Sequence, residues 1–372
     1  MDVKGSLDKL EESWSVAVGG TKITMLDKDN WISLHQAGKF LASLPFHGEQ
    51  LHFANGDRFL AKILETKGGR LRFQMAEAAS KDAMQVAVSA LSLIWFKAPE
   101  NVEDIESWRW KRATEARSRD KAWLTNGDEV EGILKGIESG KVSMEANHKV
   151  VEISRDKIAV IGLSTELASM LKPKAVYGRV FLVDGARLAL LKATKSDAKT
   201  VTGTTLFAEP VTFPLEILQS VSLYQGRAIY LSDLKHRDYE FSSYLGSFRW
   251  PFVKDGCVEN HELHVGGNVF AKGLGMHSQS RLAYDLGGKY QRFEAVVGLD
   301  EKSSQQGTAQ IQVLVDGKPR ALGKPSEIKA FDKPLSISID ITGAKQLTLV
   351  VNFGKRGSVQ SHVDWADARL IR

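Results

Sequence analysis

The turn sequences Asn-Gly and Asp-Gly recur between pairs of short apolar segments in the first 225 residues. Three segments share this plan: "LHFANGDRFLAKIL" at 51–64, "AWLTNGDEVEGILK" at 122–135 and "VFLVDGARLALLKA" at 180–193. Glycine accepts the positive φ of tight hairpin turns, and such a turn between two apolar segments is a strong hairpin signal. The sequence therefore predicts three copies of one β-hairpin.

Each hairpin is followed by further short apolar segments, so that each copy holds four or five strands in roughly 50 residues, enough for a small barrel. We expect an all-β protein that begins with an array of small SH3/Sm-like barrels. The predicted domains are 1–100, which includes the N-terminal strands, 101–165 and 166–227. The polar segment 99–119 has helical character and is expected to link or support the barrels.

From about residue 228 the pattern changes to longer alternating strands. Apolar residues occupy every second position in 281–286, 292–299, 309–315, 335–341 and 346–352, with no helical pattern between them. Strands of this kind, joined by turns that contain Gly and Asp, are typical of two packed sheets. We therefore expect residues 228–372 to form a jelly-roll β-sandwich.

The composition is that of ordinary globular protein, with 43% hydrophobic and 26% charged residues. The net charge of +5 is mild and its bases are mixed with acids, so a nucleic-acid partner is not indicated. Cys257 is the only cysteine, which excludes an intrachain disulfide and a metal site built on cysteine pairs. No apolar run reaches the roughly 18 residues that a membrane-spanning helix needs.

Several motifs in the last third resemble the NPCBM family of carbohydrate-binding modules, which are attached to glycoside hydrolases and to secreted bacterial proteins. They are "YLSDL", "KGLGMHSQSRLAYDLGGKYQRFEAVVGLD", "VLVDGK" and "HVDWADARLIR", in that order. The resemblance implies a galactose-binding-like β-sandwich that is noncatalytic and binds galactose-containing glycans. It also implies a structural calcium ion in many members.

The polar segment around His277 is the first candidate for a glycan site. Neutral imidazole, hydroxyl and amide groups both donate and accept hydrogen bonds, as sugar hydroxyls require. We expect His277, Ser278, Arg281 and Asp300 to contribute side chains. The alternative is a histidine that ties its loop to a backbone carbonyl.

Two tryptophans in this region receive different interpretations. Trp250 lies in the loop-like stretch "SFRWPFVKDG" and is a candidate platform for the apolar face of a sugar ring. The alternative is that Trp250 and the following proline seal an edge of the sandwich. Trp365 has alternating neighbours, so we expect it in the core.

Calcium requires oxygen ligands, and Asp255 and Asp367 are the candidates if the first and last strands of the sandwich are neighbours. The alternative is two solvated carboxylates. The segment 351–365 carries Asn352, Ser358 and Ser361 at positions where several relatives are expected to have acidic residues.

Catalysis of glycoside hydrolysis would need two carboxylates that face each other across a cleft. Asp300, Asp364 and Asp367 are candidates, but a chain with 45 acidic residues always offers some. No nucleophile elbow, zinc-binding helix or phosphate loop is present. We therefore expect a noncatalytic protein.

The sequence as a whole predicts noncatalytic recognition of a glycan, with the barrels as a scaffold or as a site for a protein partner. One alternative is Sm-like RNA binding by the barrels through Arg70, Arg72, Lys121 and Lys135. Another is a structural or protein-interaction role without sugar binding. We expect export to the periplasm or the extracellular space, with the signal peptide absent from this sequence, and a cytoplasmic location stays open.

Overall fold

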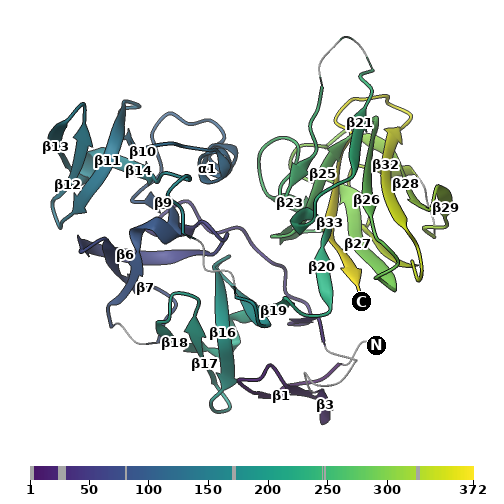
Figure 1. Ribbon diagram of the computed structural model, residues 1–372, viewed down its shortest axis with the longest axis horizontal. Coiled ribbons are helices and arrows are strands. Elements are labelled where there is room, and N and C mark those ends of the chain that lie inside the picture. Colours follow the sequence, from purple (N-terminus) through teal and green to yellow (C-terminus); the bar gives the residue numbers. More distant parts are fainter. Residues whose placement is uncertain are drawn as a thin grey trace. The chain divides into compact units, whose positions relative to one another are not determined.

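A computed structural model describes residues 4–23, 31–79, 82–169, 173–244, 246, 249–323 and 327–372 (Figure 1). Strands make up 51% of the described residues, among which α1 (Ile105–Thr114) is the one α-helix. The chain divides into two units, Met1–Gly226 and Arg227–Arg372. Part of the expected N-terminal barrel piece, residues 24–30, lies outside the described residues.

Each predicted hairpin begins a run of five strands in the same order. Four strands follow one another as a meander, a single 3₁₀ turn comes next, and the fifth strand returns to pair with the first. The first copy consists of β5 (Gln50–Phe53), β6 (Arg58–Lys67), β7 (Arg70–Met75), β8 (Met84–Ala87), η1 (Val88–Ala90) and β9 (Leu91–Trp95).

The second and third copies repeat this order. The second consists of β10 (Asp120–Leu124), β11 (Glu129–Ile137), β12 (Lys141–Ala146), β13 (Lys149–Ser154), η2 (Arg155–Lys157) and β14 (Ile158–Gly162). The third consists of β15 (Tyr177–Leu182), β16 (Arg187–Lys195), β17 (Thr200–Thr205), β18 (Pro210–Pro214), η3 (Leu215–Ile217) and β19 (Leu218–Tyr224). The predicted repeat is therefore present, and its closure into barrels of the SH3 or Sm type stays a prediction.

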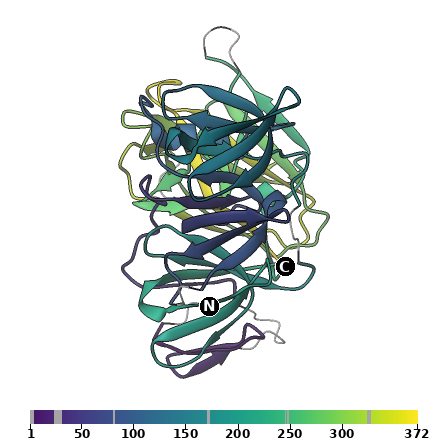
Figure 2. The ribbon, with the colours of Figure 1, turned by 90° about the vertical axis from the view of Figure 1, so that its left-hand side faces the viewer.

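The first copy lies between the other two. Its strand β9 pairs with β14 of the second copy, and its strand β6 pairs with β16 of the third copy. Figure 2 shows the copies following one another, with the first copy in the middle. One hydrophobic core takes in Leu51, Ile137 and Phe213, one from each copy. The three copies thus share this core, and a second, smaller cluster around Trp95 and Trp123 lies between the first and second copies.

The strands before the first copy attach to the third copy. β4 (Ser33–His35) pairs with β19 and extends its sheet, whereas β1 (Leu7–Leu10), β2 (Val16–Val18) and β3 (Thr21–Ile23) form a small sheet of their own. The ring of Trp14 lies so close to Gly178 that a β-carbon added there would come within 2.2 Å of it. Glycine at this position therefore allows the N-terminal segment to cover the third copy.

The C-terminal unit is a sandwich of two antiparallel sheets. The first sheet contains β22 (Val253–Lys254), β25 (Gly273–His277), β33 (His362–Ile371), β27 (Arg292–Leu299) and β31 (Leu335–Asp340), with β20 (Ala228–Tyr230) on β33. The second contains β21 (Asp238–Phe241), β26 (Ser280–Asp285), β32 (Gln346–Phe353), β28 (Thr308–Val315), β29 (Lys318–Arg320) and β30 (Glu327–Lys329). The predicted two-sheet sandwich is confirmed.

The strands lie where the alternation predicts them, to within one residue at each end. Their inward-facing residues form a separate hydrophobic core in which Tyr284, Phe293 and Trp365 have no exposed surface. The interpretation of Trp365 as a core residue is therefore confirmed. The remaining elements of this unit are the 3₁₀ turn η4 (Leu231–Asp233) and a hairpin of β23 (Leu263–Val265) and β24 (Asn268–Phe270).

The Asn-Gly-Asp turn occurs in the first and second copies with different surroundings. Asp128 is exposed, whereas Asp57 is only 2% exposed. The Asp57 carboxylate contacts the guanidinium of Arg179 at 3.1 Å and accepts a hydrogen bond from the Ala189 amide at 2.9 Å. Burial raises the pKa of Asp57, although Arg179 lowers it. This buried ion pair joins the first copy to the third.

We predict that Asp57→Ala destabilises the N-terminal unit by about 3–5 kcal/mol, because it leaves the Arg179 guanidinium buried without its carboxylate. Asp128→Ala removes the same side chain from the same turn at the surface and is expected to cost about 1 kcal/mol or less. Urea unfolding followed by tryptophan fluorescence measures both. Equal losses in the two variants would show that the ion pair contributes nothing beyond the turn.

Candidate functional site

Three loops meet at one end of the C-terminal unit. They are the segment that follows β21, the turn between β25 and β26, and the segment between β32 and β33. The Ser242 amide donates to the Gln279 carbonyl at 2.9 Å, and the Ser278 amide donates to the Ser361 carbonyl at 3.3 Å. Figure 1 shows the ends of β21 and β32 at the end of this unit opposite the C-terminus. This loop end contains most of the residues predicted for the glycan site.

Trp250 lies flat against His277 at the centre of the loop end. Their ring centroids are 4.8 Å apart and the ring planes differ by 3°. The Tyr239 hydroxyl donates to the Trp250 carbonyl at 2.7 Å and fixes the backbone there. Trp250 is partly exposed. Its position is therefore set by a stacked imidazole beneath it and a hydrogen bond from β21.

His277 is not the open contact that the sequence suggested. The residue is 4% exposed and lies beneath Trp250, and its Nδ1 faces the carbonyl oxygen of Ser278. Burial lowers the pKa of His277, although the backbone carbonyls of Ser278 and Ser358 raise it. The expectation that the His277 side chain contacts the glycan directly is corrected, because Trp250 covers the ring. The alternative interpretation, a histidine that ties its loop to a backbone carbonyl, describes what the structure shows.

His362, which the sequence analysis did not single out, extends this cluster. Its ring centroid lies 5.3 Å from His277 and 5.5 Å from Trp250. Burial and then the neighbouring His277 lower the pKa of His362 to about 4. Burial thus favours the neutral form of both adjacent imidazoles. Its place in the quoted "HVDW" motif, beside a predicted core tryptophan, was the available signal.

Tyr244 is a second aromatic residue that the sequence analysis missed. Its ring is 57% exposed, packs edge-on against Phe353 at 5.0 Å and lies against Gly357. A β-carbon on Gly357 would come within 3.3 Å of this ring, and the φ of Gly357 is +63°. Glycine therefore allows the tyrosine to rest on the neighbouring loop. The mixture of aromatic and small residues in 241–250 was its only sequence signal.

Ser278 and Arg281 differ in exposure. Ser278 is 1% exposed, and its hydroxyl has no hydrogen-bond partner among the described residues. Arg281 is exposed, and its guanidinium lies 3.9 Å from the carboxylate of Glu240 on the adjacent strand. Of the predicted ligand-binding residues, Arg281 and Trp250 are the two with surface open to solvent.

Asp300 is fully buried, so the expectation that it reaches a ligand is corrected. Its Oδ1 accepts hydrogen bonds from the Ser303 amide at 2.8 Å and from the Ser303 hydroxyl at 2.7 Å. Its Oδ2 accepts from the His264 amide at 3.2 Å. The turn that follows β27 folds over this carboxylate. Asp300 therefore belongs to the interior beneath the loops.

Asp255 and Asp367 do not fit a shared calcium ion. β25 lies between β22 and β33, so the strands that carry these residues are not neighbours. The Asp255 carboxylate accepts from the Lys272 ammonium at 2.7 Å, and Asp367 contacts Arg369 at 3.3 Å. Each carboxylate already has a cationic side chain beside it. A calcium ion would have to displace both.

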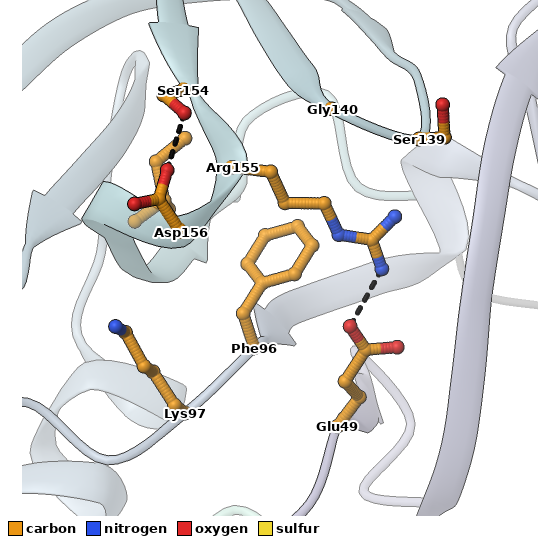
Figure 3. Close-up of a pocket in the computed structure, with 9 residues that line it drawn as sticks. Glu49, Phe96, Lys97, Ser139, Gly140, Ser154, Arg155 and Asp156 are labelled. Atoms are coloured by element: carbon orange, nitrogen blue, oxygen red, sulfur yellow. Dashed lines mark hydrogen bonds and ion pairs between the residues drawn. The ribbon is translucent and has the colours of Figure 1, made fainter.

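The N-terminal unit has a hollow of about 480 Å³ between its first and second copies (Figure 3). The Arg155 guanidinium enters it over the Phe96 ring, 4.9 Å from the ring centroid. This guanidinium contacts the Glu49 carboxylate at 2.6 Å and donates to the Ile63 carbonyl at 2.8 Å. Arg155, from the second copy, therefore joins it to the first copy through these contacts.

The basic residues considered for RNA binding are occupied by neighbouring groups. Arg72 contacts Glu65 at 2.5 Å, Lys121 contacts Glu129 at 2.9 Å and Lys135 contacts Glu145 at 2.6 Å. Arg70 donates to a backbone carbonyl at 3.3 Å. Three of the four basic side chains form ion pairs with acidic side chains on neighbouring strands. These pairs leave little net charge around the candidate RNA-binding residues.

Residues 227–371 match the NPCBM/NEW2 domain family. The C-terminal unit is an NPCBM/NEW2 domain. The resemblance of the motifs is therefore confirmed over the length that the sequence predicts. Across the part of the chain that the structure describes, no helix combines the length and apolar character needed to cross a bilayer.

Three known proteins illustrate what this NPCBM/NEW2 domain is similar to. A Renibacterium salmoninarum protein named "Putative endo-alpha-N-acetylgalactosaminidase" is 31% identical over 109 residues, which are 29% of this chain and 7% of that protein. The chain thus spans a small part of that relative. The CBM51 structure from Clostridium perfringens GH95 in complex with methyl-galactose is 23% identical, with a TM-score of 0.34, and the match covers 38% of this chain and 99% of that one.

The third is the Clostridium perfringens ZmpB structure that contains CBM51-2 in complex with GlcNAc and INT domains. It is 25% identical, with a TM-score of 0.35, and the match covers 46% of this chain and 36% of that one.

We predict that the pKa of His277 lies below the ordinary histidine value of 6.5 and that the pKa of His362 lies at about 4. In the unfolded chain the two imidazoles are protonated near pH 6.5. In the folded NPCBM/NEW2 domain they are protonated only at lower pH. The stability due to the neutral pair is therefore present above about pH 6.5 and is lost as the pH falls through the folded pKa values, about 4 for His362.

Histidine-selective NMR titration measures this directly, since it follows each imidazole separately from other titrating groups. His277→Gln and His362→Gln assign the two signals by their loss. A His362 signal that titrates at or above pH 6.5 would contradict the prediction.

Proposed function

We propose that the C-terminal unit recognises carbohydrate without catalysis, with a galactose-type or complex glycan as its ligand. The observation that carries the proposal is the partly exposed Trp250 indole, held on the His277 imidazole at the loop end of an NPCBM/NEW2 domain. An indole of this kind packs against the C–H face of a pyranose. The proposal assigns the ligand contact to Trp250 and a supporting role to His277.

The surroundings of Trp250 suit a polyhydroxylated ligand. Tyr244 adds a second exposed ring on the same chain segment. The turn beneath contributes Gln279, which is partly exposed, and the loop between β32 and β33 contributes the exposed Arg356 and Gln360. Amides donate and accept hydrogen bonds, and a guanidinium donates, so sugar hydroxyls find both kinds of partner.

Binding at a single site of this kind is weak, because a small hydrated ligand buries little area to offset its lost freedom. The N-terminal unit is proposed to act as a scaffold, or to bind a protein partner that brings several copies together. Strand β13 supports this role because it is an edge strand, and its residue Val150 is 61% exposed. Exposed edges with apolar side chains are suited to pairing with another chain.

The absence of catalysis is supported by the burial of the candidate acids. Asp300 and Asp364 have no exposed surface, and Asp367 contacts Arg369. A glycosidase needs an acid and a base or nucleophile that both reach the scissile bond. None of these carboxylates is placed to do so.

Two alternatives to glycan recognition differ in how far the structure supports them. RNA binding by the N-terminal unit is disfavoured, because the candidate bases form ion pairs with neighbouring acids. A structural role without sugar binding is favoured by one observation, the burial of His277 under Trp250. Export to the periplasm or the extracellular space follows from glycan recognition as the proposed role.

We predict that Trp250→Ala weakens glycan binding at least tenfold, because a stacked indole contributes about 1.5–3 kcal/mol when its apolar area is buried. Binding of the full chain is measured first on a glycan array and then by calorimetry, with galactosides and N-acetylglucosamine as the first probes. Tyr244→Ala tests the second ring.

Phe40→Ala is the matched control, because it removes an aromatic ring that is 62% exposed in the other unit. This variant is expected to bind as the unchanged chain does. A folded chain that binds no glycan above background would overturn the proposed function and leave the structural alternative.

A further inference from the structure

A second group of polar side chains lies buried beneath the same loops, away from the exposed face of Trp250. It begins with a tight turn after β22 in which the Cys257 amide donates to the His261 carbonyl at 2.8 Å and the Asn260 amide donates to the Cys257 carbonyl at 3.0 Å. These bonds bring Cys257 and His261 to one side of the turn. Both residues are buried, at 0% and 2% exposed.

The sheet under this turn carries a carboxylate between two glycines. Asp364 of β33 is paired with Gly275 of β25 on one side and with Gly298 of β27 on the other. A β-carbon on Gly275 would come within 2.5 Å of the Gly256 carbonyl. The absence of a side chain there lets the turn approach the sheet. Asp364 and the turn therefore face each other across a short gap.

Within the part of the chain that the structure describes, two polar atoms of this group make no hydrogen bond: Nε2 of His261 and Oδ1 of Asp364. The other imidazole nitrogen of His261, Nδ1, lies 2.8 Å from the Glu262 carbonyl. A carbonyl only accepts hydrogen bonds, so Nδ1 carries the proton and Nε2 presents a lone pair. That lone pair points toward Asp300, whose Oδ1 is 3.5 Å away.

The charges of the group are also unbalanced. The amide of His264 donates to both Asp300 and Asp364 at 3.2 Å, so the two carboxylates lie side by side without solvent. Burial and then Asp300 raise the pKa of Asp364 well above its usual range. Burial and the same two carboxylates raise the pKa of the Cys257 thiol. A bound cation would compensate the charge of these two adjacent, buried carboxylates.

We propose that Cys257, His261, Asp300 and Asp364 form a structural site for a divalent transition-metal ion of the zinc type. The ligand atoms of Cys257, His261 and Asp300 lie within 4.8 Å of one another. A tetrahedral zinc ion holds such atoms roughly 3.3–3.5 Å apart, so these three would have to draw closer, and the proposal adds Asp364 as the fourth ligand because its carboxylate lies beside that of Asp300. Binding releases the thiol proton to solvent, since the metal ligand is the thiolate.

The hydrogen-bond partners of His261 and Asp300, and the types of ligand atom, support a zinc-type ion. The Glu262 carbonyl orients His261, and Ser303 bonds to Asp300, as outer partners of metal ligands usually do. A thiolate and an imidazole suit zinc, cobalt and similar ions, whereas calcium takes oxygen ligands. The site therefore discriminates against calcium by its chemistry.

Cobalt provides a site-specific test, because Cys257 is the only cysteine of the chain. The full chain is produced in medium containing Co²⁺ or Zn²⁺, so that the ion is present while the buried site forms. We expect one metal ion per chain by elemental analysis. The Co²⁺ protein should show a thiolate-to-cobalt absorption band and visible bands of tetrahedral intensity, unchanged by excess Ca²⁺.

Cys257→Ser is expected to abolish the thiolate band, and His261→Gln to weaken Zn²⁺ binding at least about 100-fold, more than the loss of an outer partner. His236→Gln is the matched control, because this ring packs against Phe252 and belongs to another part of the unit. It should leave metal content and spectrum unchanged. A folded chain without stoichiometric metal, or with a cobalt spectrum that persists in Cys257→Ser, would overturn the site.

Discussion

The pairing of β33 with β25 on one side and β27 on the other is the constraint on which the C-terminal unit depends. Alternation along β33 sends Val363 and Trp365 into the core and leaves His362 and Asp364 on the opposite face. A shift of one residue would exchange these two sets. The core and the polar groups beneath the loops are thus fixed by one register.

His362 contacts both polar regions that this register creates. Its ring lies against Trp250 and His277, and its Nδ1 is 3.0 Å from the Ser303 hydroxyl that also bonds to Asp300. The stacked aromatic cluster and the buried carboxylates therefore rest on a common strand and share a neighbour. The exposed indole is held by an interior that is itself polar, so its orientation depends on hydrogen bonds as well as on packing.

Periodicity was enough to predict the sandwich strands, because each inward-facing residue leaves a local signal at every second position. The family was predictable because its motifs are contiguous. The site was only partly predictable, because it depends on loops that meet from distant parts of the chain. The contact of the His264 amide with Asp364 joins residues 100 positions apart. Nothing local to His277 shows that Trp250 covers it, so its residue type suggested a ligand contact that burial prevents.

The N-terminal repeats also show that local sequence does not determine the surroundings of a residue, since the same Asn-Gly-Asp turn has different surroundings in the first and second copies. The turn carboxylate is paired with Arg179 in the first copy and exposed in the second, at Asp57 and Asp128. In the third copy the aligned residue is Ala186, and the carboxylate of the turn is instead Asp184, at the position of the asparagine in the other two copies. Asp184 lies beside Glu77, and burial and then this neighbour raise the pKa of Glu77 to about 9. The hairpin sequence specifies the turn in each case. The neighbouring copy that the turn faces decides whether its carboxylate is paired, as Asp57 is with Arg179, or exposed, as Asp128 is.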